Sequence, residues 1–363
     1  MQNPAAPGFS RPLLFAGKRD IMSLKRTEYF PVHRRGAEIK EKRVRNLRDT
    51  LGREITYLRI SLTDLCNLRC VYCMPPEGVR KQEHRAILSF EEIEEIARAA
   101  VSMGVRKIRL TGGEPLVRRG MLSLCRGLRE IPGVEELTLT TNGLLLPEMA
   151  EPLKAAGVDR INVSLDTLDP DKYRKITRIG SLDQVLAGIR AARDAGLTPL
   201  KLNCVLIGGF NDDEIPALAA LTRDEPVEVR FIELMPIGHA VPFGPEAYLP
   251  CETVLEHLPR LERTGQDGGV AERYRLPGAA GTVGLIRPLS RCFCRQCNRI
   301  RLTADGCLKP CLHSREELPL RGLHGEQLRA QLERAILHKP EQHAELSARS
   351  RSQAARDMNQ IGG

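Results

Sequence analysis

The sequence of 363 residues contains no tryptophan, and aromatic residues of all kinds make up only 4% of it. Proteins that hold single-stranded nucleic acids usually stack the bases on aromatic side chains, so this scarcity argues against that class. No stretch approaches the roughly 18 consecutive apolar residues that a membrane-spanning helix needs, and the chain does not open on a secretory hydrophobic region. We therefore expect a cytoplasmic protein with neither a membrane nor a nucleic-acid partner.

Eleven cysteines in a chain without a secretion signal argue against a disulfide framework and favour a reducing compartment. Three of them are scattered among apolar or mixed residues and are expected to be buried as small hydrophobic side chains, namely Cys125, Cys204 and Cys251. The others fall into two tight sets, one at 66, 70 and 73 and one at 292, 294, 297 and 311, with Cys307 inside the second span. These sets predict metal chemistry.

The formal charge of +9 is concentrated near the start of the chain. Residues 1–50 are rich in arginine and lysine and poor in acids, which predicts a flexible basic extension. A transit peptide or a segment that binds nucleic acid or membrane remains an alternative for it. The positive charge outside this segment suits a polyanionic substrate.

From residue 51 to 250 the sequence alternates between β-rich runs and amphipathic helical segments. Helix starts are indicated by pairs that resemble capping boxes, Ser89 with Glu92, Ser181 with Gln184 and Asn211 with Glu214. Six strands that alternate with helices predict parallel β/α units, either in an open doubly wound sheet or in a partial barrel. The predicted strands are Thr56–Ile60, Lys107–Leu110, Glu136–Thr140, Arg160–Leu165, Leu200–Leu206 and Glu228–Leu234.

Unusual residues gather just after these strands, at the rim where parallel sheets and barrels bind ligands. Besides the first cysteine set, they are the segments 111–115 (TGGEP), 140–143 (TTNG), 164–166 (SLD) and 233–236 (ELMP). Motifs after five different strands predict a binding site at one end of the sheet.

After residue 250 the alternation stops, and residues 251–340 are expected to form an α+β extension. Arg273–Leu276 with Leu285–Ile286 and Arg299–Thr303 with Cys307–Leu312 resemble two hairpins, and residues 324–338 a helix. The tail, 341–363, has too little apolar content to fold alone.

The first cysteine set has the spacing C-x3-C-x2-C. Three thiolates cannot complete a structural zinc site, which takes four ligands. An iron–sulfur cubane has four irons, so three cysteines leave one iron free for another molecule. Cys66, Cys70 and Cys73 therefore favour a [4Fe–4S] cluster that binds a ligand.

With the Gly-Gly-Glu-Pro segment that follows the second strand, this motif resembles the radical S-adenosylmethionine superfamily, whose fold is a partial (β/α)6 barrel. The resemblance implies that S-adenosylmethionine chelates the open iron and that one electron cleaves it to methionine and a 5′-deoxyadenosyl radical. It also implies that Tyr72, Gly113, Ser164 and Met235 form the cofactor pocket.

The second set reads C-x2-C-x13-C through Cys294, Cys297 and Cys311. Alone, it is compatible with a zinc ribbon, with Cys292 or Cys307 as the fourth ligand, or with a second iron–sulfur cluster. The run Asn298–Arg301 favours the cluster, because strand alternation places Arg299 and Arg301 on one face, where two guanidinium groups suit an anion or a purine edge.

This run, the second set and the terminal Gly-Gly narrow the resemblance, over residues 50–363, to the family of GTP 3′,8-cyclases of molybdenum cofactor biosynthesis. It implies a second [4Fe–4S] cluster on Cys294, Cys297 and Cys311, whose open iron binds guanine. It further implies that the deoxyadenosyl radical takes the ribose C3′ hydrogen and that C3′ then attacks guanine C8. Residues that resemble the family's GTP contacts are Arg59, Arg109, Thr140, Lys201, Arg299, Ile300 and Arg301.

The same resemblance places the tail, with Gly362 and Gly363, in the active site. It implies that the product passes to a cyclic pyranopterin synthase, and a homodimer is a further expectation. A radical enzyme that matures a peptide is the alternative enzyme, and a metal-dependent nucleic-acid-binding protein is the alternative outside enzymes.

Overall fold

The structure is a computed structural model that describes residues 47–362, apart from 81–82, 267–268 and 348. The predicted basic extension therefore lies almost wholly outside the described residues, as does Gly363. In the part that is described, no helix is both long and apolar enough to cross a membrane.

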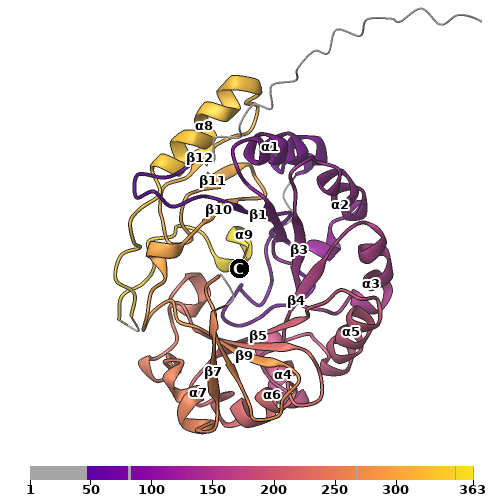
Figure 1. The fold of residues 1–363 in the computed structure, drawn as a ribbon, viewed down its shortest axis with the longest axis vertical. Helices are drawn as coiled ribbons and strands as arrows, with labels where there is room; N and C mark the ends of the chain where they lie inside the picture. Colours follow the sequence, from indigo (N-terminus) through magenta and orange to yellow (C-terminus); the bar gives the residue numbers. More distant parts are fainter. Residues whose placement is uncertain (1–46, 81–82, 267–268, 348, 363) are drawn as a thin grey trace, which may run out of the picture. The chain divides into compact units, whose positions relative to one another are not determined.

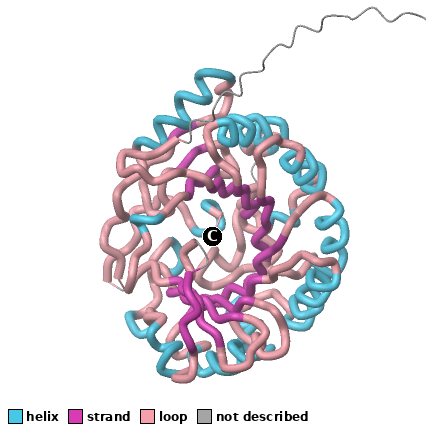
Figure 2. Tube along the Cα trace, in the orientation of Figure 1, coloured by secondary structure: helices cyan, strands magenta, loops and turns pink. Residues whose placement is uncertain are grey.

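The centre of the fold is a curved row of six parallel strands with helices on its outer side (Figure 1 and Figure 2). The strands follow one another in chain order, and each pairs in parallel with the next. A doubly wound sheet would reverse its order at a switch point, so the partial barrel is confirmed. The strands are β1 (Tyr57–Ser61), β2 (Lys107–Thr111), β3 (Glu136–Thr141), β4 (Arg160–Ser164), β5 (Lys201–Leu206) and β6 (Glu228–Glu233).

The outer layer consists of the helices that connect these strands. They are α1 (Phe90–Ser102), α2 (Met121–Arg129), α3 (Leu146–Ala155), α4 (Pro170–Thr177), α5 (Leu182–Asp194) and α6 (Ile215–Ala220). The C-terminal part adds α7 (Glu252–His257), α8 (Gly325–Leu337) and α9 (Met358–Ile361). Helix α8 confirms the helix predicted at 324–338 and lies beside α1, where His324 contacts Glu95 at 2.8 Å.

The strands of the C-terminal extension do not form a sheet of their own. Strand β10 (Arg299–Leu302) pairs in parallel with β1, and β9 (Thr282–Ile286) with β6, so the extension continues the barrel at both edges. Outside them lie β11 (Cys307–Lys309) and β12 (Leu318–Pro319) on one side and β8 (Glu272–Arg275) and β7 (Glu262–Gln266) on the other. Both predicted hairpins are confirmed, as the antiparallel pairs β8–β9 and β10–β11.

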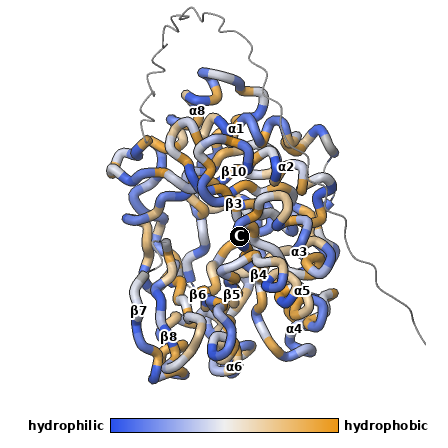
Figure 3. Tube along the Cα trace, turned by 45° about the vertical axis from the view of Figure 1, so that its right-hand side comes forward, coloured by the Kyte–Doolittle hydropathy of each residue, from blue (hydrophilic) through white to orange (hydrophobic). Residues whose placement is uncertain are grey.

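Strand alternation gives the sheet two different faces. Residues such as Leu58, Ile108, Leu139 and Val163 are fully buried in the hydrophobic core between the strands and the helices. Each such burial stabilises the fold by about 1.5–3 kcal/mol. The intervening residues are polar, and they face the inside of the barrel. Hydrophobic and hydrophilic residues alternate in short bands along the trace (Figure 3).

Of the three predicted capping boxes, one is confirmed. The Ser89 side chain accepts from the Glu92 N–H, and the Glu92 side chain accepts in return from the Ser89 N–H. Ser181 is the N-cap residue of α5, so the predicted helix start is confirmed, but its hydroxyl makes no cap bond and the expected capping box is not formed.

The prediction for Asn211 is also wrong, because its side chain is used elsewhere. It accepts from the Ile207 N–H at 2.9 Å and donates to the Asp166 carbonyl at 2.7 Å. Glu214, its expected partner, binds Thr167 and the Leu168 N–H. These bonds tie the loop after β4 to the loop after β5, so the two residues shape the rim and do not cap a helix.

Candidate active site

Basic side chains form a row across the inner face of the barrel. The register aligns Arg301 of β10 with Arg59 of β1, and Arg59 with Arg109 of β2. Register partners on neighbouring strands point to the same face, so the three guanidinium groups are neighbours. Arg109 and Arg301 are 4% and 7% exposed, and neither forms an ion pair with a carboxylate among the described residues.

This concentration of like charge disfavours the charged forms. Burial and the neighbouring Arg301 lower the pKa of Arg59 well below its ordinary value. Burial and then Arg299 lower the pKa of Arg301 to about 10. Burial lowers the pKa of Arg109, whose Nε also has no hydrogen-bond partner in the described structure. An anion that binds here would therefore be stabilised by the positive charges and by the N–H donors of the guanidinium groups.

Further predicted contacts lie on the same inner face. The Arg109 guanidinium donates to the Thr140 hydroxyl at 3.1 Å, which joins β2 to β3. Lys201 is 4% exposed and lies 3.3 Å from Glu228, which also pairs with Arg230. Ile300 differs from the others, because its side chain is 1% exposed in the hydrophobic core. Only its main chain is left for a contact with a substrate.

The first cysteine set lies in the loop after β1, and its three cysteines are half-buried. Burial raises the pKa of Cys66 to about 11 and that of Cys73 to about 12, and it raises the pKa of Cys70 well above the ordinary value. Hydrogen bonds already reach the sulfurs, since the Leu68 N–H lies 3.3 Å and the Asn142 amide 3.7 Å from Cys66 Sγ. Three half-buried cysteines in one loop, with N–H donors beside the Cys66 sulfur, fit an iron–sulfur cluster, whose potential such bonds tune.

The Gly-Gly-Glu segment after β2 packs against this loop. The Gly113 N–H donates to the Thr63 carbonyl at 2.7 Å, and the Glu114 N–H to the Leu65 carbonyl at 2.8 Å. A Cβ atom on Gly113 would overlap the Leu65 carbonyl. The absent side chain therefore allows the cysteine loop to approach.

Glu114 is 1% exposed, and burial raises its pKa to about 7. Its carboxylate accepts from the Leu116 and Asn142 N–H groups and from the Thr141 hydroxyl. It thereby fixes the loop after β3 to the loop after β2, and so holds the Asn142 amide beside Cys66.

Three other residues are predicted for the cofactor pocket, Tyr72 in the cysteine loop and Ser164 and Met235 at the ends of two further strands. The Tyr72 hydroxyl donates to Asp166 at 2.7 Å, and Asp166 also accepts from the Val205 N–H at 2.9 Å. Burial raises the pKa of Asp166 to about 6. Ser164 ends β4 and Met235 follows β6, and both are half-buried at the same rim. The structure thus brings Tyr72, Gly113, Ser164 and Met235 to one end of the barrel.

The second cysteine set lies at the opposite end of the same strands. Cys297 precedes β10, which runs parallel to β1, whereas Cys66 follows β1. Burial opposes ionisation of Cys297, but Arg299 and then Lys339 outweigh it and lower the pKa of Cys297 to about 6. The Arg299 guanidinium lies 3.7 Å from the Cys297 sulfur. A stabilised thiolate with a charged donor fits a metal cluster.

Two buried cations hold this second loop in place. The Lys339 ammonium donates to the carbonyls of Arg299 at 2.8 Å and Pro310 at 2.7 Å, and so links the segments that carry Cys297 and Cys311. Arg53, which precedes β1, donates to the Cys294 carbonyl at 2.7 Å and to three carbonyls of residues 339–341.

The two additional cysteines have different surroundings. Cys292 is exposed, and Cys307 lies in β11, where burial raises its pKa and Thr303 and Asp305 are its neighbours. No three His, Cys, Asp or Glu residues of the described chain converge on one metal ion. Cysteines of a cubane bind separate irons and need no such convergence. Cys125, Cys204 and Cys251 are buried, as expected.

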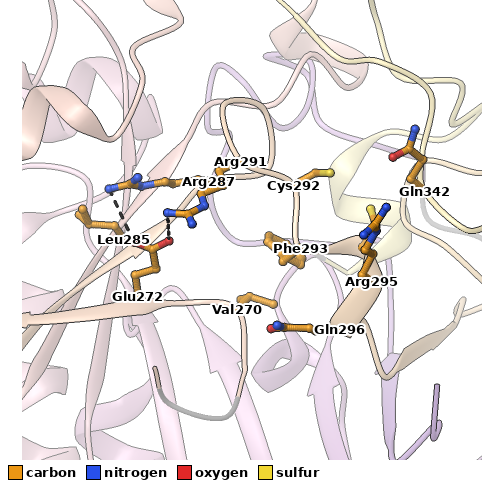
Figure 4. Close-up of a pocket in the computed structure, with 11 residues that line it drawn as sticks. Val270, Glu272, Leu285, Arg287, Arg291, Cys292, Phe293, Arg295, Gln296 and Gln342 are labelled. Carbon is orange, nitrogen blue, oxygen red and sulfur yellow. Dashed lines mark hydrogen bonds and ion pairs between the residues drawn. The ribbon is translucent and has the colours of Figure 1, made fainter. Parts of the chain in front are cut away.

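A cavity of about 280 Å³ opens beside the second loop (Figure 4). Cys292 and Cys294 line it together with Arg287 and Arg291, whose guanidinium groups approach Glu272 at 3.9 and 3.1 Å. The segment that carries Cys294 is therefore reached from this cavity.

The described end of the chain lies inside the barrel (Figure 1). Arg301 donates to the Gly362 carbonyl at 2.5 Å, and the Asn359 amide donates to the Asp64 carbonyl at 3.0 Å. Gly362 has φ +69°, and a Cβ atom there would overlap the Thr111 hydroxyl, so only glycine fits. The predicted position of Gly362 is thus observed, while Gly363 lies outside the described residues.

Sequence reasoning missed several residues of this site, namely Arg53, Tyr57, Lys107, Asp166, Arg230 and Asn359. Strand alternation alone places Tyr57, Lys107 and Arg230 on the inner face with Arg59, Arg109 and Lys201, so that signal was present in the sequence. Asp166 belongs to a segment that the sequence marked as a rim motif. Arg53 and Asn359 act through contacts distant in sequence, which no local pattern reveals.

The chain matches two family models, the Radical SAM superfamily over residues 60–222 and Molybdenum Cofactor Synthesis C over residues 227–345. The crystal structure of Streptococcus suis SuiB bound to its precursor peptide SuiA is similar, with a TM-score of 0.57 and 14% identity over 80% of this chain and 66% of that one. At that identity the likeness shows the fold alone. Fold, cysteine loop and family match together define a radical S-adenosylmethionine protein.

Proteins of similar sequence indicate one family within this class. The GTP 3′,8-cyclase of Alkaliphilus oremlandii (strain OhILAs) is 49% identical over 87% of this chain and 100% of its own length. That of Peptoclostridium acidaminophilum is 52% identical over 87% of this chain and 98% of its own length. The chain therefore belongs to the family of GTP 3′,8-cyclases.

Proposed function

We propose that this protein is the lyase of molybdenum cofactor biosynthesis that converts GTP into (8S)-3′,8-cyclo-7,8-dihydroguanosine 5′-triphosphate. Its cofactors are two [4Fe–4S] clusters and S-adenosylmethionine. The observation that carries the proposal is the row Arg301–Arg59–Arg109, which lies between two cysteine loops at opposite ends of the barrel strands.

The charge and the length of this space suit a nucleoside triphosphate. A triphosphate carries about four negative charges, and arginine forks pair with phosphate oxygens through two parallel bonds. A strand of five residues such as β1 is about 16 Å long. A nucleotide can therefore lie between the loops, with its phosphates on the cationic row.

Each cysteine triplet fits a cluster with one open iron. Cys66, Cys70 and Cys73 would hold the first cluster, and Cys294, Cys297 and Cys311 the second. Together with S-adenosylmethionine, the cluster on Cys66, Cys70 and Cys73 would supply radical chemistry, for which the protein needs no general base.

The residues of the chain have the task of binding and orienting. Tyr72, Gly113, Ser164 and Met235 would enclose the cofactor, and Asp166 holds the Tyr72 ring in place through its hydroxyl. On the substrate side, Arg59, Arg109, Thr140, Lys201, Arg299 and Arg301 would fix the nucleotide, together with the main chain of Ile300. The main chain of Gly362 lies against Thr111 and Ser61, so this end of the described chain would help to hold the bound molecules in place.

The test is turnover by the anaerobically reconstituted full chain with GTP, S-adenosylmethionine and a reductant. We expect one 5′-deoxyadenosine for each cyclised nucleotide, measured by chromatography and by the fluorescence of the pterin formed on acid treatment. Cleavage of S-adenosylmethionine that GTP does not stimulate, without any pterin, would contradict the proposal.

The peptide maturase is not favoured by any contact in the barrel, because an extended peptide offers no match for the buried cationic row. A precursor peptide in place of GTP should leave 5′-deoxyadenosine formation at the background rate. We further propose a cytoplasmic enzyme, without a nucleic-acid partner, that passes its product to a cyclic pyranopterin synthase. A homodimer remains a proposal that sedimentation of the reconstituted chain tests.

A further inference from the structure

Tyr57 is the one tyrosine on the inner face of the described barrel strands. It begins β1, and the register places it between Arg299 of β10 and Lys107 of β2. The Lys107 ammonium lies 5.1 Å and the Arg109 guanidinium 5.9 Å from the centre of its ring. The Tyr57 ring therefore lies against two cations of β2, and its register partner on the other side, in β10, is a third cationic residue.

The charged groups that face Tyr57 come from every strand packed against it. The strongest are Arg59 on β1, Lys107 and Arg109 on β2, and Arg299 on β10, and Arg301 on β10 also interacts with Tyr57. The nearest acid in register, Glu136, is already shared by Lys107 and Arg160, at 2.5 Å each. Burial alone would raise the pKa of Tyr57, but the four cations outweigh it and lower that pKa to about 7.

We propose that the Tyr57 phenol is the internal counter-ion of the cationic row, ionised in the empty barrel and protonated when the phosphates of a nucleotide take over the same cations. Binding would then consume one proton from the solvent, which converts the phenolate oxygen into a hydroxyl. The inference rests on the proposed function, because it assumes a polyphosphate ligand on this row.

The sign of the effect follows from the charges. Without ligand, four cations favour the phenolate, whereas about four phosphate charges nearby cancel that field and favour the neutral phenol. The ligand therefore binds better to the protonated enzyme. Its dissociation constant should rise by up to about tenfold for each pH unit above 7, until the pKa of the complex is reached.

The experiment measures proton uptake by titration calorimetry in buffers of different ionisation enthalpy. The sample is the anaerobic protein with its clusters, at pH 8 and without S-adenosylmethionine, so that no turnover occurs. Tyr57→Phe keeps the ring between Lys107 and Arg109 and removes the hydroxyl. Tyr248→Phe is the matched control, since its hydroxyl bonds to the Ala240 carbonyl at 2.6 Å, away from the cationic row.

We expect about 0.9 of a proton per GTP in the wild type beyond that in Tyr57→Phe, and no such difference for Tyr248→Phe. Equal uptake by the wild type and Tyr57→Phe would overturn the inference while leaving the proposed function intact. Inorganic tripolyphosphate separates the two ideas, because it should give the same uptake without the guanine. If tripolyphosphate binds with this proton uptake and GTP does not bind, the proposed function is wrong, but the inference that Tyr57 is the counter-ion is supported.

A measurement on the wild type alone remains decisive if Tyr57→Phe does not fold. The sequence has no tryptophan and six tyrosines, so loss of a phenolate is visible in the near-ultraviolet difference spectrum. Tripolyphosphate should remove one phenolate at pH 8. An unchanged spectrum at saturating tripolyphosphate would contradict the inference.

Discussion

The two cysteine sites use the same number of predicted ligands and differ in their electrostatic surroundings. Around the first, the charged neighbours are mostly acids, with Asp166 near Cys70 and Asp357 near Cys73, and burial keeps the thiol pKa values high. Around the second, Arg299 and Lys339 lower the pKa of Cys297 to about 6. One barrel thus has an end that disfavours negative charge and an end that favours it.

The difference indicates a division of tasks. A neutral or positively charged cofactor suits the first end, and a polyanion suits the side that the arginines of β1, β2 and β10 line. Arg299, one of the two cations that stabilise the Cys297 thiolate, also belongs to the proposed nucleotide site. The segment that would hold the second cluster therefore also forms part of the proposed nucleotide site.

The largest expected effect is loss of activity when one predicted cluster ligand is removed, in one variant at the first cysteine set and in another at the second. Cys66→Ala should abolish formation of 5′-deoxyadenosine, because the first cluster would be lost. Cys297→Ala should leave slow cleavage of S-adenosylmethionine but abolish the pterin. Both variants should contain about half of the wild-type iron.

Chromatographic product analysis and iron determination distinguish the two variants, and Cys125→Ala, at a buried cysteine outside both sets, is the control. If Cys297→Ala also stopped all cleavage, the two ends would not have separate tasks.

Thiol reactivity in the cluster-free chain should differ by about a hundredfold. At pH 7 the Cys297 thiol is mostly ionised, whereas a thiol with a pKa of about 11 is almost wholly protonated, and the lower nucleophilicity of the more acidic thiolate offsets part of this advantage. Mass spectrometry after brief treatment with iodoacetamide should find Cys297 modified well before Cys66. The advantage should shrink at pH 9. Equal rates at pH 7 would mean that Arg299 and Lys339 do not act on the thiol.

Nucleotide affinity tests the cationic row. Arg109→Met removes one buried donor of a charge-assisted bond, which contributes about 1.5–3 kcal/mol, so the dissociation constant for GTP should rise about 10- to 150-fold. Equilibrium binding under anaerobic conditions measures this. Arg126→Met, on the exposed side of α2, should bind like the wild type.

The same Arg109→Met change should slightly stabilise the ligand-free protein, since it removes one of several buried like charges. We expect about 1 kcal/mol and a rise in Tm of about 1–2 °C. Calorimetry with and without GTP checks this, and excess GTP should abolish or reverse the gain. A lower Tm without ligand would show that Arg109 is fully compensated in the empty barrel.

Much of the barrel could be predicted from the sequence because its signals are local. Strand alternation and the motifs after the strands gave the six parallel strands and their common rim, and Ser89 with Glu92 gave one helix start. The helix start at Ser181 was also correct, but the capping bonds expected of Ser181 and Asn211 are not formed, because a cap motif describes only four residues. Contacts from a neighbouring loop decide where the Asn211 side chain bonds.

The site was less predictable than the fold, since its organisation depends on pairing across the whole chain. Nothing near residue 299 indicates that β10 pairs with β1, yet that pairing creates the row of Arg301, Arg59 and Arg109. The contact between Gly362 and Thr111 likewise joins segments that are far apart in the sequence, so no local pattern predicts it. The resemblance to a family supplied the residues of the row, and the structure supplied their register.

The pairing of β10 with β1 also determines when this protein can become active during its synthesis. Asn298 bonds to Thr56 across 242 positions, so both edges of the cationic pocket exist only after nearly the whole chain has left the ribosome. Folds dominated by such distant pairings form slowly, and incomplete barrels expose strand edges. The nascent chain therefore has to keep its first three cysteines reduced and its β1 edge protected until residues near 300 arrive.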